Sequence, residues 1–260
     1  MVSLIDILAA AETGENSLSA RIPETWMQGR TAYGGVSAAL ALEAALRSQD
    51  DLPPLRSAQI AFVGPLAGEV EVKTELLRRG RTAAFIEASV YGDGKLGLKA
   101  LFVFMTALES TIDYAAPSIC PEVPDFADAV PAPTHPDPKF FTNNMEFRHA
   151  LPIDKRHEPD FMRWGRLKER EGLHPMVEMM AIGDALPPAA MALFEKPGPI
   201  SSMTWHVNLL TAEPVTTDGW WLTRSTADLA RDGSSSQIMQ VWNADRTPVI
   251  TGMQSVAIFV

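Results

Sequence analysis

The sequence has a single cysteine, Cys120, so it cannot form a disulfide within the chain. Cys120 lies in a proline-rich stretch and has no histidine beside it that would activate a thiolate nucleophile. We therefore expect neither a disulfide-stabilised fold nor cysteine catalysis. A reducing compartment, the cytoplasm, fits this cysteine usage best.

Long hydrophobic runs are also missing. No stretch of about 18 apolar residues could span a bilayer, so we expect no membrane integration. The first segment, "MVSLIDILAAAETGENS", lacks a basic leader followed by an uninterrupted apolar core. It predicts a short amphipathic helix of the mature protein, with no export signal.

Basic residues are outnumbered: 22 Lys and Arg stand against 32 Asp and Glu, a formal net charge of −10. Without a basic stripe to attract phosphate backbones, nucleic acid is not expected as a partner. The five histidines show no metal-ligand spacing, and no P-loop or dinucleotide fingerprint is present. We expect no metal and no cofactor.

The composition is typical of a folded protein, with 46% hydrophobic and 21% charged residues. The segment 34–47, "GGVSAALALEAALR", predicts a helix that is apolar or small almost all the way round and must be wrapped by other elements. Four strand-like segments follow it, at 55–63, 69–79, 82–91 and 96–105. This order predicts a helix followed by an antiparallel meander.

The second half repeats this order. Seven prolines between Pro117 and Pro138 mark an extended linker. Beyond it we expect strands at 143–151 and 161–169, a helix at 174–185, and strands at 202–210, 219–230, 235–244 and 249–260. In this repeat, Gly80 corresponds to Gly233, about 150 residues later. The helix start at Gly34 corresponds to the Asp184 region at nearly the same offset.

The predicted fold class is therefore α+β, with two tandem units that each wrap a curved antiparallel sheet around a long helix. The expected boundaries are 1–108 for the first unit, 109–142 for the Pro-rich linker and 143–260 for the second unit.

The ordered set of segments resembles the double-hotdog acyl-CoA thioesterases of the type II class. The resemblance is carried by "GRTAYGGVSAALALEAA" and "SAQIAFVGPLAGEVEVKTELLRRGRTAAFIEASVYGDGKLGLKALFVF", and by "GDALPPA", "SSMTWHVNLL" and "TGMQSVAIF" in the second half. It implies hydrolysis of acyl-CoA by a water that an Asp, a Ser or Thr, and a Gln activate together. These positions match Asp184, Ser202 and Gln254, with Ser201 as the alternative hydroxyl. The resemblance also implies a homodimer or higher homo-oligomer.

The chemistry of these residues is consistent with that role. Thioester hydrolysis needs a base for the attacking water and donors for the oxyanion. Asp184 follows a methionine-rich helix, where desolvation would raise its pKa towards the operating pH. Gln254 alternates in line with apolar Val256, and the matching position of the first half is Phe102. The structural alternatives are that Asp184 caps a turn before two prolines and that Gln254 satisfies a stray backbone group.

Ser202 fits less simply. Strict alternation along "SSMTWHVNLL" groups it with Thr204, His206 and Asn208, which turns it away from the helix side unless a bulge intervenes. A Ser-His-Asp triad through His206 is disfavoured, because no G-x-S-x-G elbow is present to expose a nucleophile.

For substrate binding, the helix start in "AYGGVS" offers backbone N–H groups to a thioester oxygen. Tyr33, Gly34 and Gly35 are therefore candidates for substrate contact, although the glycines serve tight packing equally well. Two larger groups have weaker support. A basic cluster could meet CoA phosphates (Arg78, Arg79, Arg81 and Lys95), and a set of methionines could line an acyl tunnel (Met176, Met179, Met180 and Met191).

Other activities remain open. "GDALP" is similar to the G-D-x-x-P of hotdog enoyl-CoA hydratases and dehydratases, but those need a His soon after the Asp, and none follows here. A non-catalytic acyl-CoA or lipid-binding protein is the second alternative, and a double hotdog that has lost activity is the third. The sequence leaves the acyl chain length, the head group and the choice between CoA and acyl-carrier protein open.

Overall fold

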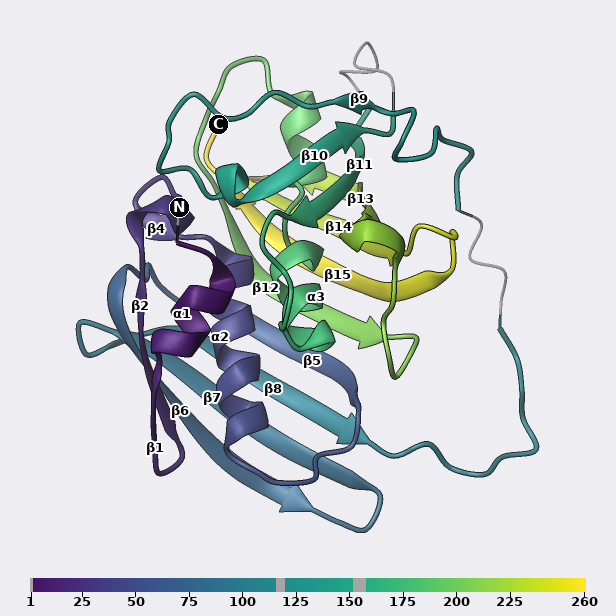
Figure 1. Ribbon diagram of the computed structural model, residues 1–260. Helices are drawn as coiled ribbons and strands as arrows, with labels where there is room; N and C mark the ends of the chain where they lie inside the picture. The colour runs from purple at the N-terminus through teal and green to yellow at the C-terminus, as the bar shows by residue number, and fades with distance from the viewer. Residues whose placement is uncertain (1, 116–119, 152–157) are drawn as a thin grey trace.

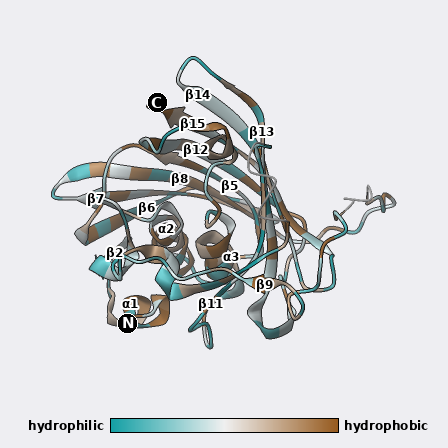
Figure 2. Ribbon diagram, turned by 90° about the horizontal axis from the view of Figure 1, so that it is seen from above, coloured by the Kyte–Doolittle hydropathy of each residue, from teal (hydrophilic) through white to brown (hydrophobic). Residues whose placement is uncertain are grey.

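The computed structural model describes residues 2–115, 120–151 and 158–260. Within these residues, a 13-stranded antiparallel sheet curves around two helices that pack against each other (Figure 1). Seen from above, both helices lie in the hollow of the sheet (Figure 2). The two tandem helix-and-sheet units predicted from the sequence are confirmed, and together they form a double hotdog.

The first unit begins with helix α1, whose N-terminus is closed by a capping box between Ser3 and Asp6. Its elements are α1 (Leu4–Ala10), β1 (Glu12–Gly14), β2 (Ser17–Ile22), η1 (Glu24–Trp26), β3 (Met27–Gln28), β4 (Thr31–Ala32), α2 (Gly34–Arg47), β5 (Leu55–Phe62), β6 (Gly68–Arg79), β7 (Ala83–Gly92) and β8 (Lys95–Met105). The α2 bounds agree with the prediction, and the predicted strands are correct to within a residue or two.

The second unit has the same core order. Its elements, including those of the preceding linker, are β9 (Val130–Pro131), η2 (Phe141–Asn144), β10 (Met145–His149), β11 (Asp160–Leu167), α3 (Pro175–Gly183), η3 (Ala189–Leu193), β12 (Ile200–Leu209), η4 (Thr217–Gly219), β13 (Trp221–Arg231), β14 (Ser234–Trp242) and β15 (Pro248–Ile258). Short strands β1 to β4 and β9 were not predicted, because two to six residues carry too little periodicity.

The expected meander is wrong at one strand. β5 pairs with β8 rather than with β6, which follows it in the sequence, so the local order is β6-β7-β8-β5. This leaves the other edge of β5 free to pair with β12, for example Ile60 opposite Trp205. The two units therefore share one sheet, and their buried side chains form a common hydrophobic core.

Matching β-bulges show that the two halves of the sheet are equivalent. The bulge at Leu76/Arg78 on β6 recurs at Ala227/Leu229 on β13, 151 residues later. The bulge at Val90/Tyr91 recurs at Val241/Trp242 with the same spacing.

The strand registers also show which buried residues of the two units are equivalent. Phe102 pairs with Ile86 in the first unit, and Gln254 pairs with Gln237 at the same place in the second. Gln254 therefore replaces a phenylalanine, as the sequence indicated.

The predicted linker is extended, and much of its described part packs on the second unit. Phe126 packs against Trp164 and Trp220 over the second unit, and Trp164 Nε1 donates to the carbonyl of Pro124 at 3.0 Å. Near its end, Phe141 stacks on Tyr33 of the first unit with ring centroids 3.9 Å apart. Residues 116–119 of the linker lie outside the described residues.

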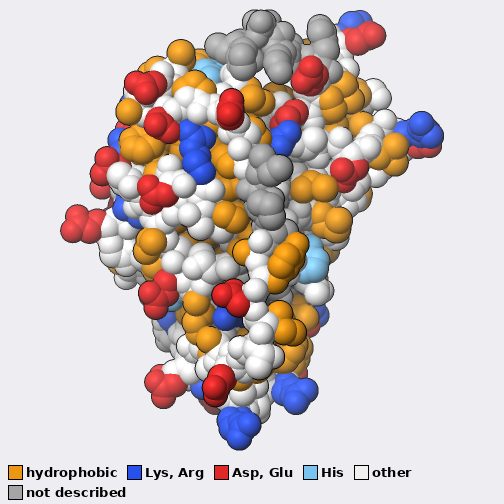
Figure 3. Space-filling view, turned by 90° about the vertical axis from the view of Figure 1, so that its right-hand side faces the viewer, with side chains coloured by type: hydrophobic (Ala, Val, Ile, Leu, Met, Phe, Trp, Pro, Cys, Tyr) orange, Lys and Arg blue, Asp and Glu red, His pale blue; other side chains and the backbone are white. Residues whose placement is uncertain are grey.

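Charges are spread over the surface. The face in Figure 3 carries acidic and basic side chains in scattered positions. The predicted basic cluster is only partly retained: Arg78, Arg79 and Arg81 lie at the turn between β6 and β7, whereas Lys95 lies beyond the other end of β7. None of the described helices is long and apolar enough to cross a membrane.

Candidate active site

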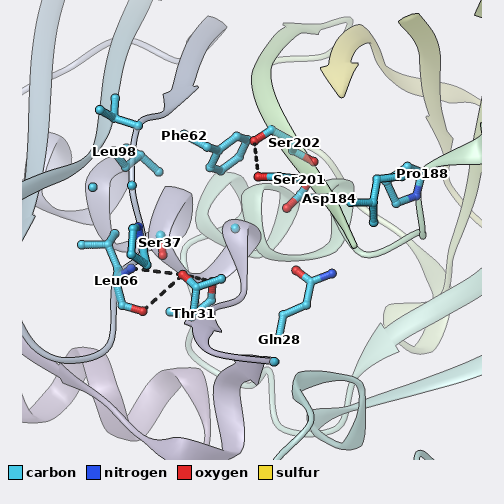
Figure 4. A pocket seen from close by; sticks show the side chains of 18 of the residues that line it. Gln28, Thr31, Ser37, Phe62, Leu66, Leu98, Asp184, Pro188, Ser201 and Ser202 are labelled. Atoms are coloured by element: carbon cyan, nitrogen blue, oxygen red, sulfur yellow. Dashed lines mark hydrogen bonds between the residues drawn. The ribbon is translucent and has the colours of Figure 1, made fainter. Parts of the chain in front are cut away.

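A cavity of about 530 Å³ opens where the two units meet (Figure 4). The first unit contributes Gly34 from the start of α2 and Phe62 from the end of β5. The second unit contributes Asp184, Ser201 and Ser202. Three of the predicted site residues, Gly34, Asp184 and Ser202, therefore line one cavity, and none of the four histidines within the described residues is among those that line it.

Asp184 and Gln254 are hydrogen-bonded. Asp184 follows the last residue of α3, and Gln254 lies on β15 with 3% of its surface exposed. Nε2 of Gln254 donates to Oδ1 of Asp184 at 2.8 Å. The two residues are 70 positions apart in the sequence, and the structure places them together as the resemblance implied.

Gln237 is a site residue that the sequence analysis missed. It is completely buried on β14, directly across from Gln254, and its Nε2 donates to Oε1 of Gln254 at 2.7 Å. A signal was available, because Gln237 alternates with Met239 and Val241 in an otherwise apolar row. Gln254 stood out both by its apolar surroundings and by the family resemblance, and that resemblance does not extend to Gln237.

Burial raises the pKa of Asp184 to about 7, while the hydrogen bond from Gln254 and the nearby backbone N–H of Gly35 act in the opposite direction. The positive end of the α2 dipole adds to that effect. A carboxylate with this pKa exchanges protons close to neutral pH.

Gly34 leaves the space that this carboxylate occupies. A Cβ atom on Gly34 would lie 2.6 Å from Oδ2 of Asp184 and 2.9 Å from Cε1 of Phe62. A glycine fits at position 35 for a different reason, because a Cβ atom there would lie 2.5 Å from the ring of Tyr33. The sequence repeat predicted that Gly34 and Asp184 occupy equivalent positions of the two units. In the structure these two residues contact each other across the interface of the units.

A β-bulge decides the orientation of Ser202. Ser202 pairs with Val256, but Thr204 pairs with Ser255, so Met203 is the extra residue. The bulge shifts the alternation and turns Ser202 to the side of Trp205 and Gln254, as the sequence analysis required. Ser202 is half-buried, whereas Ser201 is exposed, although both reach the cavity.

Tyr33 does not have the expected position. Its side chain is 1% exposed, does not line the cavity, and donates from its hydroxyl to the carbonyl of Ala181 at 2.9 Å. Burial, followed by the charge of Asp184, raises the pKa of Tyr33 well above its ordinary value, so the hydroxyl stays a donor. Tyr33 thus connects α2 to α3 in place of a substrate contact.

The predicted methionine-lined tunnel is not part of this cavity, and the disfavoured triad through His206 does not form. Met176, Met179 and Met180 are buried in the core and Met191 is 38% exposed, and none of the four lines the cavity. His206 pairs with Met253 and Gln59 on the outer face of the sheet, opposite to the side of Asp184. Across residues 2–115, 120–151 and 158–260, no group of three His, Cys, Asp or Glu side chains could hold a metal ion.

Comparisons with solved structures place the fold. A conserved hot dog fold protein of unknown function from Alicyclobacillus acidocaldarius superimposes with a TM-score of 0.86, at 20% identity over 100% of this chain and 99% of that chain. A tesB protein of Mycobacterium avium subspecies paratuberculosis gives 0.81, at 20% identity over 99% and 100%. The acyl-CoA thioesterase II TesB2 of Mycobacterium marinum gives 0.72, at 15% identity over 97% of each chain.

Comparison with protein-family models shows to which family the chain belongs. No curated protein matches the sequence. The model of the acyl-CoA thioesterase N-terminal domain matches residues 22–108, and that of the C-terminal domain matches residues 120–258. The C-terminal match begins inside the segment 109–142 that the sequence analysis treated as linker. Together the two models cover both helix-and-sheet units, and the chain belongs to the acyl-CoA thioesterase family.

Proposed function

We propose that the protein hydrolyses the thioester of an acyl-CoA to a free acid and CoA. The observation that carries this proposal is the hydrogen bond from Gln254 to Asp184 at the wall of a cavity between the two units. Family membership supports the same chemistry. The pair supplies a carboxylate base and an amide that holds it in place, which is what activation of a water requires.

In the proposed step, Asp184 accepts a proton from a water while the water oxygen attacks the thioester carbonyl carbon. The resulting tetrahedral intermediate collapses with cleavage of the C–S bond, and the departing thiolate takes the proton back from Asp184. The products are the carboxylic acid and the thiol. A pKa of about 7 lets one group act as base and then as acid near neutral pH.

The neighbouring groups have supporting roles in this proposal. Gln254 is not among the residues that line the cavity, so in this proposal it orients the water through the Asp184 carboxylate that it holds. The hydroxyl of Ser202 is a further partner for the water, since it lines the same cavity. Gly34 stands at the first position of α2, where the backbone N–H has no acceptor within the helix, and it is the proposed donor to the oxyanion.

Two other functions compete with hydrolysis. A hydratase or dehydratase of this fold needs a histidine beside its acid, and in the part of the chain that the structure describes no histidine lines the cavity. A non-catalytic acyl-CoA or lipid-binding protein would use the same cavity without using the Asp184 carboxylate.

The test is thiol release from a panel of acyl-CoA esters of increasing chain length, with wild type and Asp184→Asn compared at saturating substrate. We expect the variant to lose activity by about 10²- to 10⁴-fold, as for removal of a general base. Unchanged thiol release would refute the role of Asp184. Absence of thiol release in wild type, together with tight acyl-CoA binding by calorimetry, would favour the binding protein. Water release from a 3-hydroxyacyl-CoA would favour the dehydratase.

Self-association and location are also proposals. The outer face of strands β5, β12, β15 and β14 carries rows of uncharged side chains, including the central row of Gln59, His206, Met253 and Ile238. Met253 is 53% exposed and Ile238 is 40% exposed there. We propose that two copies pair through this face, where no like charges would repel. The single cysteine remains the basis for a cytoplasmic location.

A further inference from the structure

The relay behind Asp184 has a fixed direction. The backbone N–H of Ala189 donates to Oε1 of Gln237 at 2.8 Å, and the hydroxyl of Ser225 reaches the same oxygen at 3.2 Å. A backbone N–H can only donate, so the group of Gln237 that it contacts must be the oxygen. The Nε2 group of Gln237 is then directed to Gln254.

The same logic continues to the carboxylate. Because Gln237 donates to Gln254 at 2.7 Å, the amide of Gln254 must present its oxygen to Gln237 and its nitrogen to Asp184. With the opposite orientation, Gln254 would place its oxygen against the Asp184 carboxylate, which is favourable only when Asp184 is protonated. The orientation of two side-chain amides is thus set by one backbone N–H of η3.

The fold itself does not require this pair of amides. At the equivalent places of the first unit, the sheet carries Ile86 and Phe102, both completely buried. Two buried glutamines in the second unit need hydrogen-bond partners that an apolar pair does not. Each finds one: Gln237 is bonded to η3 and to Gln254, and Gln254 is bonded to Asp184.

We propose that Gln237 is a positioning residue: it holds Gln254 in the orientation that donates to Asp184 and so keeps Asp184 ready to accept a proton. This inference rests on the proposed role of Asp184 as the base. Gln237 lies behind Gln254 and does not line the cavity, so it acts through Gln254 and not on the substrate.

The test is the variant Gln237→Met, which keeps the length of the side chain and removes the amide. We expect the pKa of Asp184 to rise by about one unit, so that at pH 6 the deprotonated fraction and kcat fall about tenfold, with recovery at pH 9 and little change in KM. Ser225→Ala is the matched control, because it removes only the 3.2 Å contact to the same oxygen and should leave the pKa in place.

A structural role is separated from a positioning role by the double variant. In a Gln254→Met background, Gln237→Met should shift the pKa no further, because Gln237 acts through Gln254. A shift that persists there, or an unchanged pKa in folded Gln237→Met, would overturn the proposal.

The pKa is also measured without activity, by carboxyl ¹³C NMR titration with Asp184→Asn for assignment. If Gln237→Met does not fold, a second NMR measurement on the wild-type protein still tests the proposal. The side-chain amide of Gln254 should titrate with Asp184 and show a nuclear Overhauser effect to the amide of Gln237. Absence of both would overturn the proposal. If wild type releases no thiol but the NMR results hold, the proposed function fails while the positioning of Gln254 by Gln237 stands.

Discussion

Asp184 and Gly34 meet across the boundary between the two units: the space where a Gly34 Cβ would stand is occupied, at 2.6 Å, by Oδ2 of Asp184. The carboxylate belongs to the C-terminal end of α3, and the glycine opens α2. The candidate active site therefore exists only when both halves of the chain are folded against each other.

Gly34→Ala tests this contact. The added methyl group must displace the Asp184 carboxylate or the ring of Phe62, so we expect a loss of about 1–3 kcal/mol in the free energy of unfolding and a large loss of thiol release. Gly80→Ala is the control, because its Cβ would meet nothing closer than 3.8 Å. Chemical denaturation and a thioesterase assay measure both effects. Equal stability and activity in the two variants would show that the contact is unimportant.

Ser202→Ala and Ser201→Ala together decide which hydroxyl serves the site. Since the bulge at Met203 turns Ser202 inward, we expect about a tenfold loss of kcat from Ser202→Ala, equivalent to one hydrogen bond in the transition state. Ser201→Ala should have little effect, because Ser201 is exposed. The reverse order of the two variants in steady-state kinetics would assign the hydroxyl to Ser201.

The pH dependence of hydrolysis reports the state of Asp184. Because the base must be deprotonated, kcat should rise with pH and level off above a midpoint near the pKa of about 7. Gln254→Met removes a hydrogen bond that lowers this pKa, so its midpoint should lie higher. The measurement is a pH–rate profile of each protein. A common midpoint would mean that the titration belongs to another group.

Stability should also depend on the charge of Asp184. Its pKa is about 7 in the folded protein. The pKa is about 4 for an unfolded Asp, so the unfolded chain loses its proton first. Stability contributed by this group therefore falls as the pH rises from about 4 to about 7.

Asp184→Asn removes that dependence, and relative to wild type we expect the variant to be more stable at pH 8 than at pH 5, by at most on the order of 1.4 kcal/mol per pH unit within this window. Urea denaturation at both pH values measures the difference. Parallel pH dependence in the two proteins would show that folding does not raise the pKa of Asp184.

Ile238→Glu tests the proposed pairing of two copies. A charge within the uncharged outer face should convert a dimer into a monomer, since each copy would bring a carboxylate to the interface. Leu77→Glu is the matched control: Leu77 is 49% exposed near the end of β6, away from this face. Light scattering after gel filtration gives the mass. A wild-type monomer at tens of micromolar, or dissociation by both variants, would contradict the proposal.

Local sequence determined the elements of this protein. Helix α2 followed from a run of fourteen residues of which twelve are small or apolar, and the long strands followed from their alternation, because these signals depend only on neighbours in the chain. The prolines and the repeated order separated the two units. Asp184 and Gln254 stood out as polar residues in apolar surroundings, and family resemblance gave them a chemical role.

Tertiary structure decided how those elements meet. The register between β12 and β15 contains one extra residue, Met203, and this single insertion turns Ser202 towards the cavity. Pairing of β5 with β8 freed an edge for β12 and so brought Gly34 to Asp184. Gln237 gained its role only through contact with residues 17 and 48 positions away. Such contacts depend on strand register and helix packing over the whole chain, which the pattern of any one segment does not encode.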